Sequence, residues 1–356
     1  MISETVRQQM AKSIQHVMPT EPAKADAFTA EVYKQLEADF MPAPLVILHS
    51  PVPSVMAGVW SILRESLLAG HADRVLKEVV AAVVSKTNEC PFCVEAHTTM
   101  LHAADEHDVS SAILRGDYES IADPLHQAAA QWVLGNRTAS TSTLLPPSIP
   151  ARDTPELIGT AITFQYINRM ANIFLGDTPL PVPTLLKGIT RRLYAATAGK
   201  RVIRELEQGH SLKFVPVAEL PEDLSWAARN PAVAGAFAGF AHTVEAAGEA
   251  ALPKTVRDLV NDRIQVWNGE AVGLSRRWVE DAVMPLGRED RAAARLALLA
   301  ALASYQVDEQ VIADFRAYYP DDAQLITAAA WASWRAARRV NTWMLLRFRQ
   351  QQIWHM

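Results

Sequence analysis

The sequence contains very little cysteine. Its 356 residues include only two, Cys90 and Cys93, and they are three positions apart. A chain of this length can bury enough apolar surface to be stable without disulfides. A bridge across so short a loop would also remove little entropy from the unfolded state. The pair is therefore not there for stability, and redox chemistry or metal binding are the functions left open.

The sequence also lacks long apolar runs and a strong charge of one sign. No stretch approaches the roughly 18 apolar residues that a membrane helix needs. The first residues do not show a basic segment followed by an apolar core, so we expect no signal peptide and a cytoplasmic protein. The net charge of −5 is mild. Neither nucleic acid nor a membrane is expected as a partner.

Strand signals are scarce, and helical patterns run through most of the chain. Valines and leucines recur in pairs every four residues over 75–84, which indicates one buried helical face. Residues 290–304 are rich in strong helix formers. We therefore predict an all-α protein. The other expected helices are 3–18, 22–38, 54–69, 73–87, 91–105, 124–137, 155–174, 231–248, 254–268, 274–284, 307–317 and 322–349.

A weak internal repeat divides the chain. Matching residues keep the same order in both halves, at an offset of about 180 that shortens to about 169 toward the end of each half. This favours an internal duplication over chance similarity between two Ala/Val/Leu-rich helical stretches. We predict a first domain at 1–180, a connecting segment at 181–222 and a second domain at 223–356. The matches include Pro51/Pro231, Glu65/Glu245, Lys77/Arg257, Glu78/Asp258, Asn88/Asn268, Arg169/Arg338 and Asn172/Asn341.

The two cysteines are predicted to lie at the start of a helix. Pro91 suits the first helical turn, which makes Cys90 the N-cap and places Cys93 in that turn. The free N–H groups and the positive end of the helix dipole would then face both sulfurs. This environment predicts a lowered thiol pKa. The two-residue spacer also lets the sulfurs reach bonding distance, as reversible disulfide formation requires.

Two further residues complete a candidate proton relay. His97 lies one helical turn after Cys93 and can accept or donate a proton there. Glu78 lies in the preceding apolar helix, where a carboxylate needs a partner. We predict a relay from Cys93 through His97 to Glu78. A zinc site with the same four ligands and an inert buried pair are the alternatives, but structural zinc sites usually contain more cysteines. No cofactor or metal is expected.

These residues resemble a known signature. The order and spacing of Glu78, Cys90, Cys93 and His97 are similar to the Glu…Cys-x-x-Cys-x-x-x-His pattern of the alkylhydroperoxidase D (AhpD) group in the carboxymuconolactone decarboxylase superfamily. The resemblance is sharpest over 74–115 and extends more loosely over 40–175. It implies AhpD-like helical bundles that assemble into a homo-oligomer.

The resemblance also implies roles for the residues. Cys93 would attack a hydroperoxide and become a sulfenic acid, and Cys90 would resolve it to a disulfide. His97 would relay the proton and Glu78 would be the distal base. An external thiol or a protein reductant would reopen the disulfide. One departure is Phe92, which stands where the group's pattern has a histidine and puts the efficiency in doubt.

The second half departs further. Glu270, Gly273 and Arg277 hold the thiol and imidazole positions there, and Asp258 stands where the first half has its glutamate. This half would be a degenerate copy kept for packing, in the place of a second subunit.

The sequence thus predicts a thiol-dependent peroxidase of antioxidant type. Two other functions stay open: a thiol-disulfide oxidoreductase or redox sensor, which Phe92 favours, and a carboxymuconolactone decarboxylase-like lyase, against which the intact Cys-x-x-Cys argues. A helical assembly protein with a vestigial site is a third. Arg169 and Asn172 recur in the half without thiols, so we expect a structural role for them.

Overall fold

The computed structural model describes residues 13–179 and 204–353. Within these ranges the chain forms helices and no sheet; the only extended pairing there is an isolated bridge between Ile14 and Leu175. The predicted all-α class is therefore confirmed. Among the described residues, five short segments are 3-10 helices and a sixth, η2, is a π-helix. They are η1 (Pro22–Lys24), η2 (Arg64–Leu68), η3 (Tyr118–Ser120), η4 (Leu212–Phe214), η5 (Glu222–Arg229) and η6 (Ser304–Gln306).

The α-helices fall into an earlier and a later group along the chain. The earlier group is α2 (Ala27–Asp39), α3 (Pro44–Ile47), α4 (Pro53–Leu63), α5 (Arg74–Thr87), α6 (Pro91–Ala103), α7 (His107–Arg115), α8 (Pro124–Gly135) and α9 (Thr154–Phe174). The later group is α11 (Pro231–Ala251), α12 (Lys254–Val266), α13 (Arg277–Val283), α14 (Arg288–Leu302), α15 (Glu309–Arg316) and α16 (Asp322–Ile353).

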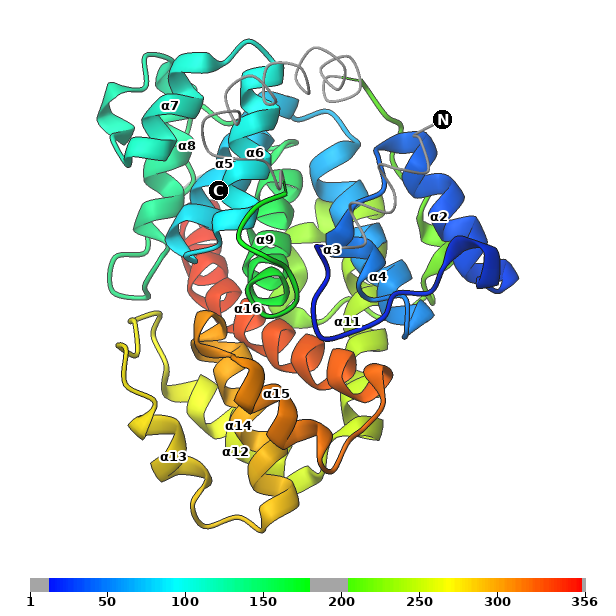
Figure 1. The fold of residues 1–356 in the computed structure, drawn as a ribbon. Helices are drawn as coiled ribbons and strands as arrows, with labels where there is room; N and C mark the ends of the chain where they lie inside the picture. Colours follow the sequence, from blue (N-terminus) through cyan, green and yellow to red (C-terminus); the bar gives the residue numbers. More distant parts are fainter. Residues whose placement is uncertain (1–12, 180–203, 354–356) are drawn as a thin grey trace, which may run out of the picture.

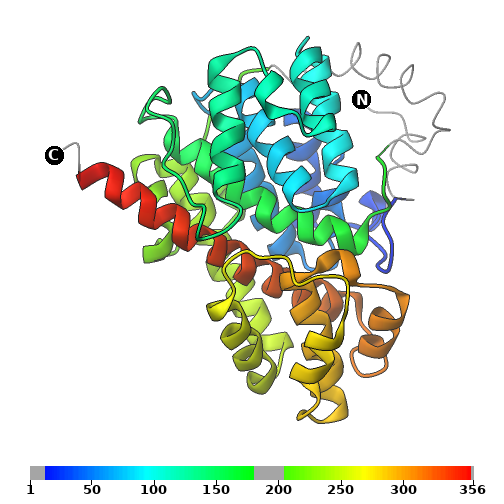
Figure 2. The same cartoon turned by 90° about the vertical axis from the view of Figure 1, so that its left-hand side faces the viewer.

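The long helix α16 runs between the two groups. Figures 1 and 2 show α16 in red, with α5 to α8 on one side of it and α12 to α15 on the other. Helix α9 packs against α16, and α4 packs against α11. One apolar core runs without a break through both groups. In both contacts, the two helices that pack together occupy equivalent positions in the predicted repeat. A two-fold relation between copies would produce such pairs, although the duplication itself stays a prediction.

The predicted helices match the observed ones closely, with three differences. The expected helix at 3–18 is wrong over 13–18, where His16 has a left-handed φ of 65° and Met18 precedes a proline; residues 1–12 lie outside the described part. Helices α3 and α7 were not predicted. Both are short, and α7 ends at Gly116, whose φ of 74° is left-handed.

None of the helices in the described ranges is both long and apolar enough to cross a bilayer.

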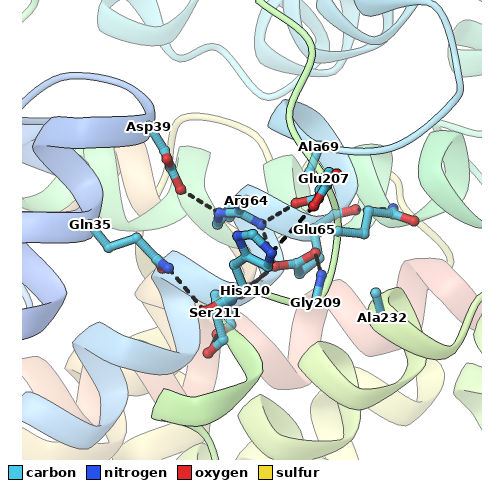
Figure 3. Close-up of polar contacts among 12 residues, drawn as sticks. Gln35, Asp39, Arg64, Glu65, Ala69, Glu207, Gly209, His210, Ser211 and Ala232 are labelled. Atoms are coloured by element: carbon cyan, nitrogen blue, oxygen red, sulfur yellow. Dashed lines mark hydrogen bonds and ion pairs between the residues drawn. The ribbon is translucent and has the colours of Figure 1, made fainter.

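A buried polar cluster fixes the chain as it enters the later group (Figure 3). The Arg64 side chain, at the start of η2, donates to Asp39 Oδ2 at 2.7 Å and to Glu65 Oε1 at 2.8 Å. The Glu65 carboxylate in turn accepts the N–H of Gly209 at 2.7 Å and the hydroxyl of Ser211 at 2.6 Å. Buried charges are tolerated only when they are paired and hydrogen-bonded in this way. The cluster thereby ties residues 209–211 to the end of α4.

Candidate functional site

The Cys-x-x-Cys segment lies at a sharp turn between two packed helices. Helix α5 buries its valine face and ends at Thr87, with Asn88 as its C-cap, and Glu89 then turns the chain with a left-handed φ of 53°. Helix α6 begins at Pro91 with Cys90 as its N-cap, as the sequence predicts. The Cys93 N–H donates to Cys90 Sγ at 3.4 Å. The helix start therefore holds both sulfurs close together.

Both thiols are free and almost completely buried, at 1% exposure for Cys90 and 0% for Cys93. Burial raises the pKa of the Cys93 thiol well above its usual value, and the neighbouring Cys90 raises it further; a hydrogen bond with Asn168 acts in the opposite direction. The expectation of a lowered pKa at this position is wrong, because desolvation outweighs the favourable helix end. Cys93 is consequently a neutral thiol at rest.

His97 and Glu78 form a buried pair, with His97 one turn of α6 after Cys93. His97 Nδ1 lies 2.6 Å from Glu78 Oε2, and the other Glu78 oxygen accepts hydrogen bonds from the Arg74 guanidinium, including one from Nε at 3.0 Å. Burial acts to raise the pKa of Glu78, but the charges and hydrogen bonds of Arg74 and His97 outweigh it and bring the pKa to about 2. Glu78 is therefore ionised and accepts the Nδ1–H of His97.

This arrangement orients the imidazole. Because Nδ1 faces the Glu78 carboxylate, Nε2 is the ring nitrogen left to exchange a proton. No hydrogen bond to Nε2, and none between His97 and either sulfur, occurs within 13–179 and 204–353. The Phe164 ring packs edge-on against the imidazole, with the ring centroids 4.5 Å apart, and fixes its plane. An imidazole held in one orientation, one helical turn after Cys93, is suited to exchange a proton there.

Helix α9 adds a polar side chain that the sequence analysis did not find. The Asn168 amide donates to Ser85 Oγ at 3.0 Å and accepts from Asn88 Nδ2 at 3.0 Å, so it is held beside Cys93. A buried asparagine in an apolar helix was the available signal, since such a group needs partners. Arg74 was also missed, although its position four residues before Glu78 could have indicated the pair.

The other residues singled out from the sequence contribute less to this site. Phe92 is buried in the apolar core. In the later group, Glu270 and Gly273 lie in the connection between α12 and α13, and Arg277 begins α13, where it pairs with Asp281 at 3.6 Å. No group of three or more His, Cys, Asp or Glu that could hold a metal ion occurs in the part of the chain that the structure describes.

Fold and site together define a class of protein: an all-helical protein with a buried dithiol at a helix start and a His–Glu pair close by. Comparison with known proteins narrows this class. The model of the carboxymuconolactone decarboxylase family matches residues 53–132. An alkyl hydroperoxide reductase of Mycobacterium tuberculosis, Rv2159c, is 36% identical over 336 residues, which are 94% of this chain and 95% of that protein. The chain belongs to the AhpD-like branch of the carboxymuconolactone decarboxylase superfamily. No solved structure matches it.

Proposed function

We propose that this protein is a thiol-dependent peroxidase that reduces hydroperoxides through a Cys90–Cys93 disulfide cycle. The observation that carries the proposal is the buried His97–Glu78 pair, 2.6 Å apart, beside a dithiol at a helix start. The name of the Mycobacterium relative supports the same activity.

In the first step, Cys93 gives its proton to Nε2 of His97, and the ionised Glu78 stabilises the resulting imidazolium. The thiolate attacks the terminal oxygen of the hydroperoxide. The O–O bond breaks, an S–O bond forms, and the leaving alkoxide takes the proton from the imidazolium to depart as an alcohol. Cys93 is then a sulfenic acid, oxidised by two electrons, and the hydroperoxide has been reduced by two.

In the second step, the sulfur of Cys90 attacks the sulfenic sulfur of Cys93. The S–S bond forms as the S–O bond breaks, and the hydroxide leaves as water with the Cys90 proton. The hydrogen bond between the Cys93 N–H and Cys90 Sγ, at 3.4 Å, supports this step because it keeps the two residues close together. An external thiol or a protein reductant then supplies two electrons and two protons to reopen the disulfide. We place this cycle in a cytoplasmic homo-oligomer.

Thiol-disulfide exchange with a protein is the second candidate, since apolar Phe92 stands between the cysteines. The burial of both sulfurs favours the peroxidase, because a hydroperoxide needs a far narrower path than a protein disulfide does. Measuring peroxide consumption and the reduction of a protein disulfide with the same preparation separates the two candidates.

Two single variants test the proposed cycle. Cys93→Ser should abolish peroxide turnover. Cys90→Ser should consume one equivalent of peroxide and stop at a sulfenic acid, detectable by a dimedone adduct in mass spectrometry. Undiminished turnover by Cys93→Ser would refute the assignment, and a dimedone adduct on Cys90 in the unaltered protein would reverse the two roles.

A further inference from the structure

A cleft lies where the two helical groups meet, next to the Cys-x-x-Cys turn. Its walls come from the residues just before Cys90, from α9, from the 302–305 segment and from residues 267–271 after α12. The Ala139 N–H donates to the Asn268 carbonyl at 2.9 Å and joins the two groups beside the cleft. The cleft has both polar and apolar lining residues, among them Gln165 and Arg169 of the first kind and Trp267 and Leu302 of the second.

Arg169 is the unusual residue of this cleft. Its side chain is 93% buried, since only 7% is exposed, and it has no carboxylate partner within the described ranges. Nε donates to the Ala301 carbonyl at 2.9 Å, and Nη1 donates to the carbonyl and side-chain oxygens of Gln165. Nη2 has no hydrogen bond to any described residue. Burial lowers the pKa of Arg169 to about 10, so the group is still charged at neutral pH.

The equivalent residue in the later group is neutralised. Arg338 donates to Asp223 Oδ1 at 2.6 Å and to Glu245 Oε1 at 3.2 Å. A buried cation is costly unless an anion compensates it. The protein supplies that anion to Arg338 from its own side chains, whereas Arg169 faces an open cleft instead.

We propose that the cleft binds an organic monocarboxylate, with its carboxylate on the Arg169 guanidinium and its apolar part against Trp267, Leu302 and Val340. The planar guanidinium suits a carboxylate because it can donate parallel hydrogen bonds. The Arg169 guanidinium carbon also lies 5.9 Å from the Trp267 ring centroid, so an indole face borders the same space. Glu89 and Glu270 are exposed at the cleft and balance the charges of Arg169 and the exposed Arg137, so the cleft has no net positive charge to attract a multiply charged anion such as a phosphate.

A chain of hydrogen bonds leads from this cleft to Asn168, the side chain that influences the Cys93 thiol. Gln165 Oε1 accepts from Arg169 Nη1 at 3.0 Å and from Asn88 Nδ2 at 3.2 Å. Asn88 Nδ2 also donates to Asn168, the side chain that acts to lower the pKa of Cys93. A ligand on Arg169 would therefore bind one polar network away from the reactive sulfur. The proposed binding does not depend on the proposed function. A link between that binding and peroxide reduction does rest on the proposed function.

Calorimetric titration with hexanoate tests the binding, with hexanol as the uncharged control. We expect hexanoate to bind and hexanol to bind at least about tenfold more weakly, because only the carboxylate engages the guanidinium. Arg169→Gln should lose hexanoate affinity to a similar degree. Because that variant also removes the hydrogen bond to Ala301, a second variant is needed. Ala271→Trp fills the cleft from an exposed position and should abolish binding with an unchanged melting temperature.

The matched control is Arg277→Gln, an exposed arginine outside the cleft, which should bind hexanoate normally. No hexanoate binding to the unaltered protein, equal binding of hexanol, or unchanged binding in Ala271→Trp would each overturn the inference. Peroxide turnover is measured alongside with a neutral hydroperoxide. Peroxide turnover without hexanoate binding would refute only this inference. Hexanoate binding without peroxide turnover would refute only the proposed function.

Discussion

The first and second halves contain the same local pair in two different surroundings. Arg74 and Glu78 lie four residues apart on α5, and Lys254 and Asp258 lie four residues apart on α12. The side chains of Arg74 and Glu78 are 13% and 1% exposed, whereas those of Lys254 and Asp258 are 79% and 55% exposed. An exposed pair of this kind contributes very little. The first pair differs by its burial and by the added contact with His97, which in the proposed mechanism accepts the Cys93 proton.

The segments that follow these two helices also differ between the halves. After α5 the chain turns tightly and starts α6 with two cysteines, while after α12 it passes through a longer connection that contains Glu270 and Gly273. The comparison teaches that the repeated residues maintain helix packing, and that the chemistry depends on what one half adds to them.

Among the changes that test this comparison, replacing the His97 imidazole should have the largest effect on peroxide turnover. His97→Gln should lower peroxide turnover about 100-fold or more, because it removes the base that accepts the Cys93 proton. Arg277→Gln, at the matching position of the second half, should leave turnover unchanged. Steady-state rates of the two purified variants check this, and equal effects would mean that the halves do not differ in function.

Replacing the Glu78 carboxylate should have the next largest effect on peroxide turnover. Glu78→Gln should lower turnover about tenfold, since the neutral amide no longer stabilises the imidazolium. Asp258→Asn removes an exposed carboxylate and should change neither turnover nor the melting temperature. A Glu78→Gln enzyme with full activity would contradict the relay.

The same carboxylate predicts a pH dependence of stability. The folded pKa of Glu78, about 2, lies below its usual value of 4.5, so its contribution is complete above about pH 4.5 and is lost as the pH falls toward 2. A shift of this size corresponds to about 3 kcal/mol of unfolding free energy. The stability difference between the wild type and Glu78→Gln should therefore shrink over that range in denaturant unfolding. A gap that stays constant down to pH 2 would contradict the pairing.

The smallest expected effect concerns Asn168, whose position in the second half is Ala337. Asn168→Ala removes a hydrogen bond that lowers the pKa of Cys93, so the thiol should titrate at a still higher pH and turnover should fall a few-fold. Stopped-flow peroxide reduction across pH measures both changes.

Much of this site could be predicted from the sequence, because its determinants are local. Pro91 fixes the start of α6, and helical spacing brings His97 to the side of the cysteines. The contact with Glu78 follows from a carboxylate in an apolar helix that needs a partner.

The rest depends on packing that a local pattern does not contain. The thiol pKa was misjudged because the helix end is visible in the sequence, whereas the burial of Cys93 under α9 is not. Asn168 approaches from 75 positions further along the chain. The same holds for Arg169: that no described residue supplies its counter-ion appears only when both halves are packed together.

The most direct measurement of the central claim is a thiolate titration by ultraviolet absorbance, with Cys93→Ser to assign the signal. If burial keeps Cys93 protonated until His97 removes its proton during turnover, the Cys93 thiolate band should be absent at neutral pH and should appear only above the ordinary thiol range of about 8.5. A full thiolate band at neutral pH that disappears in Cys93→Ser would contradict the account.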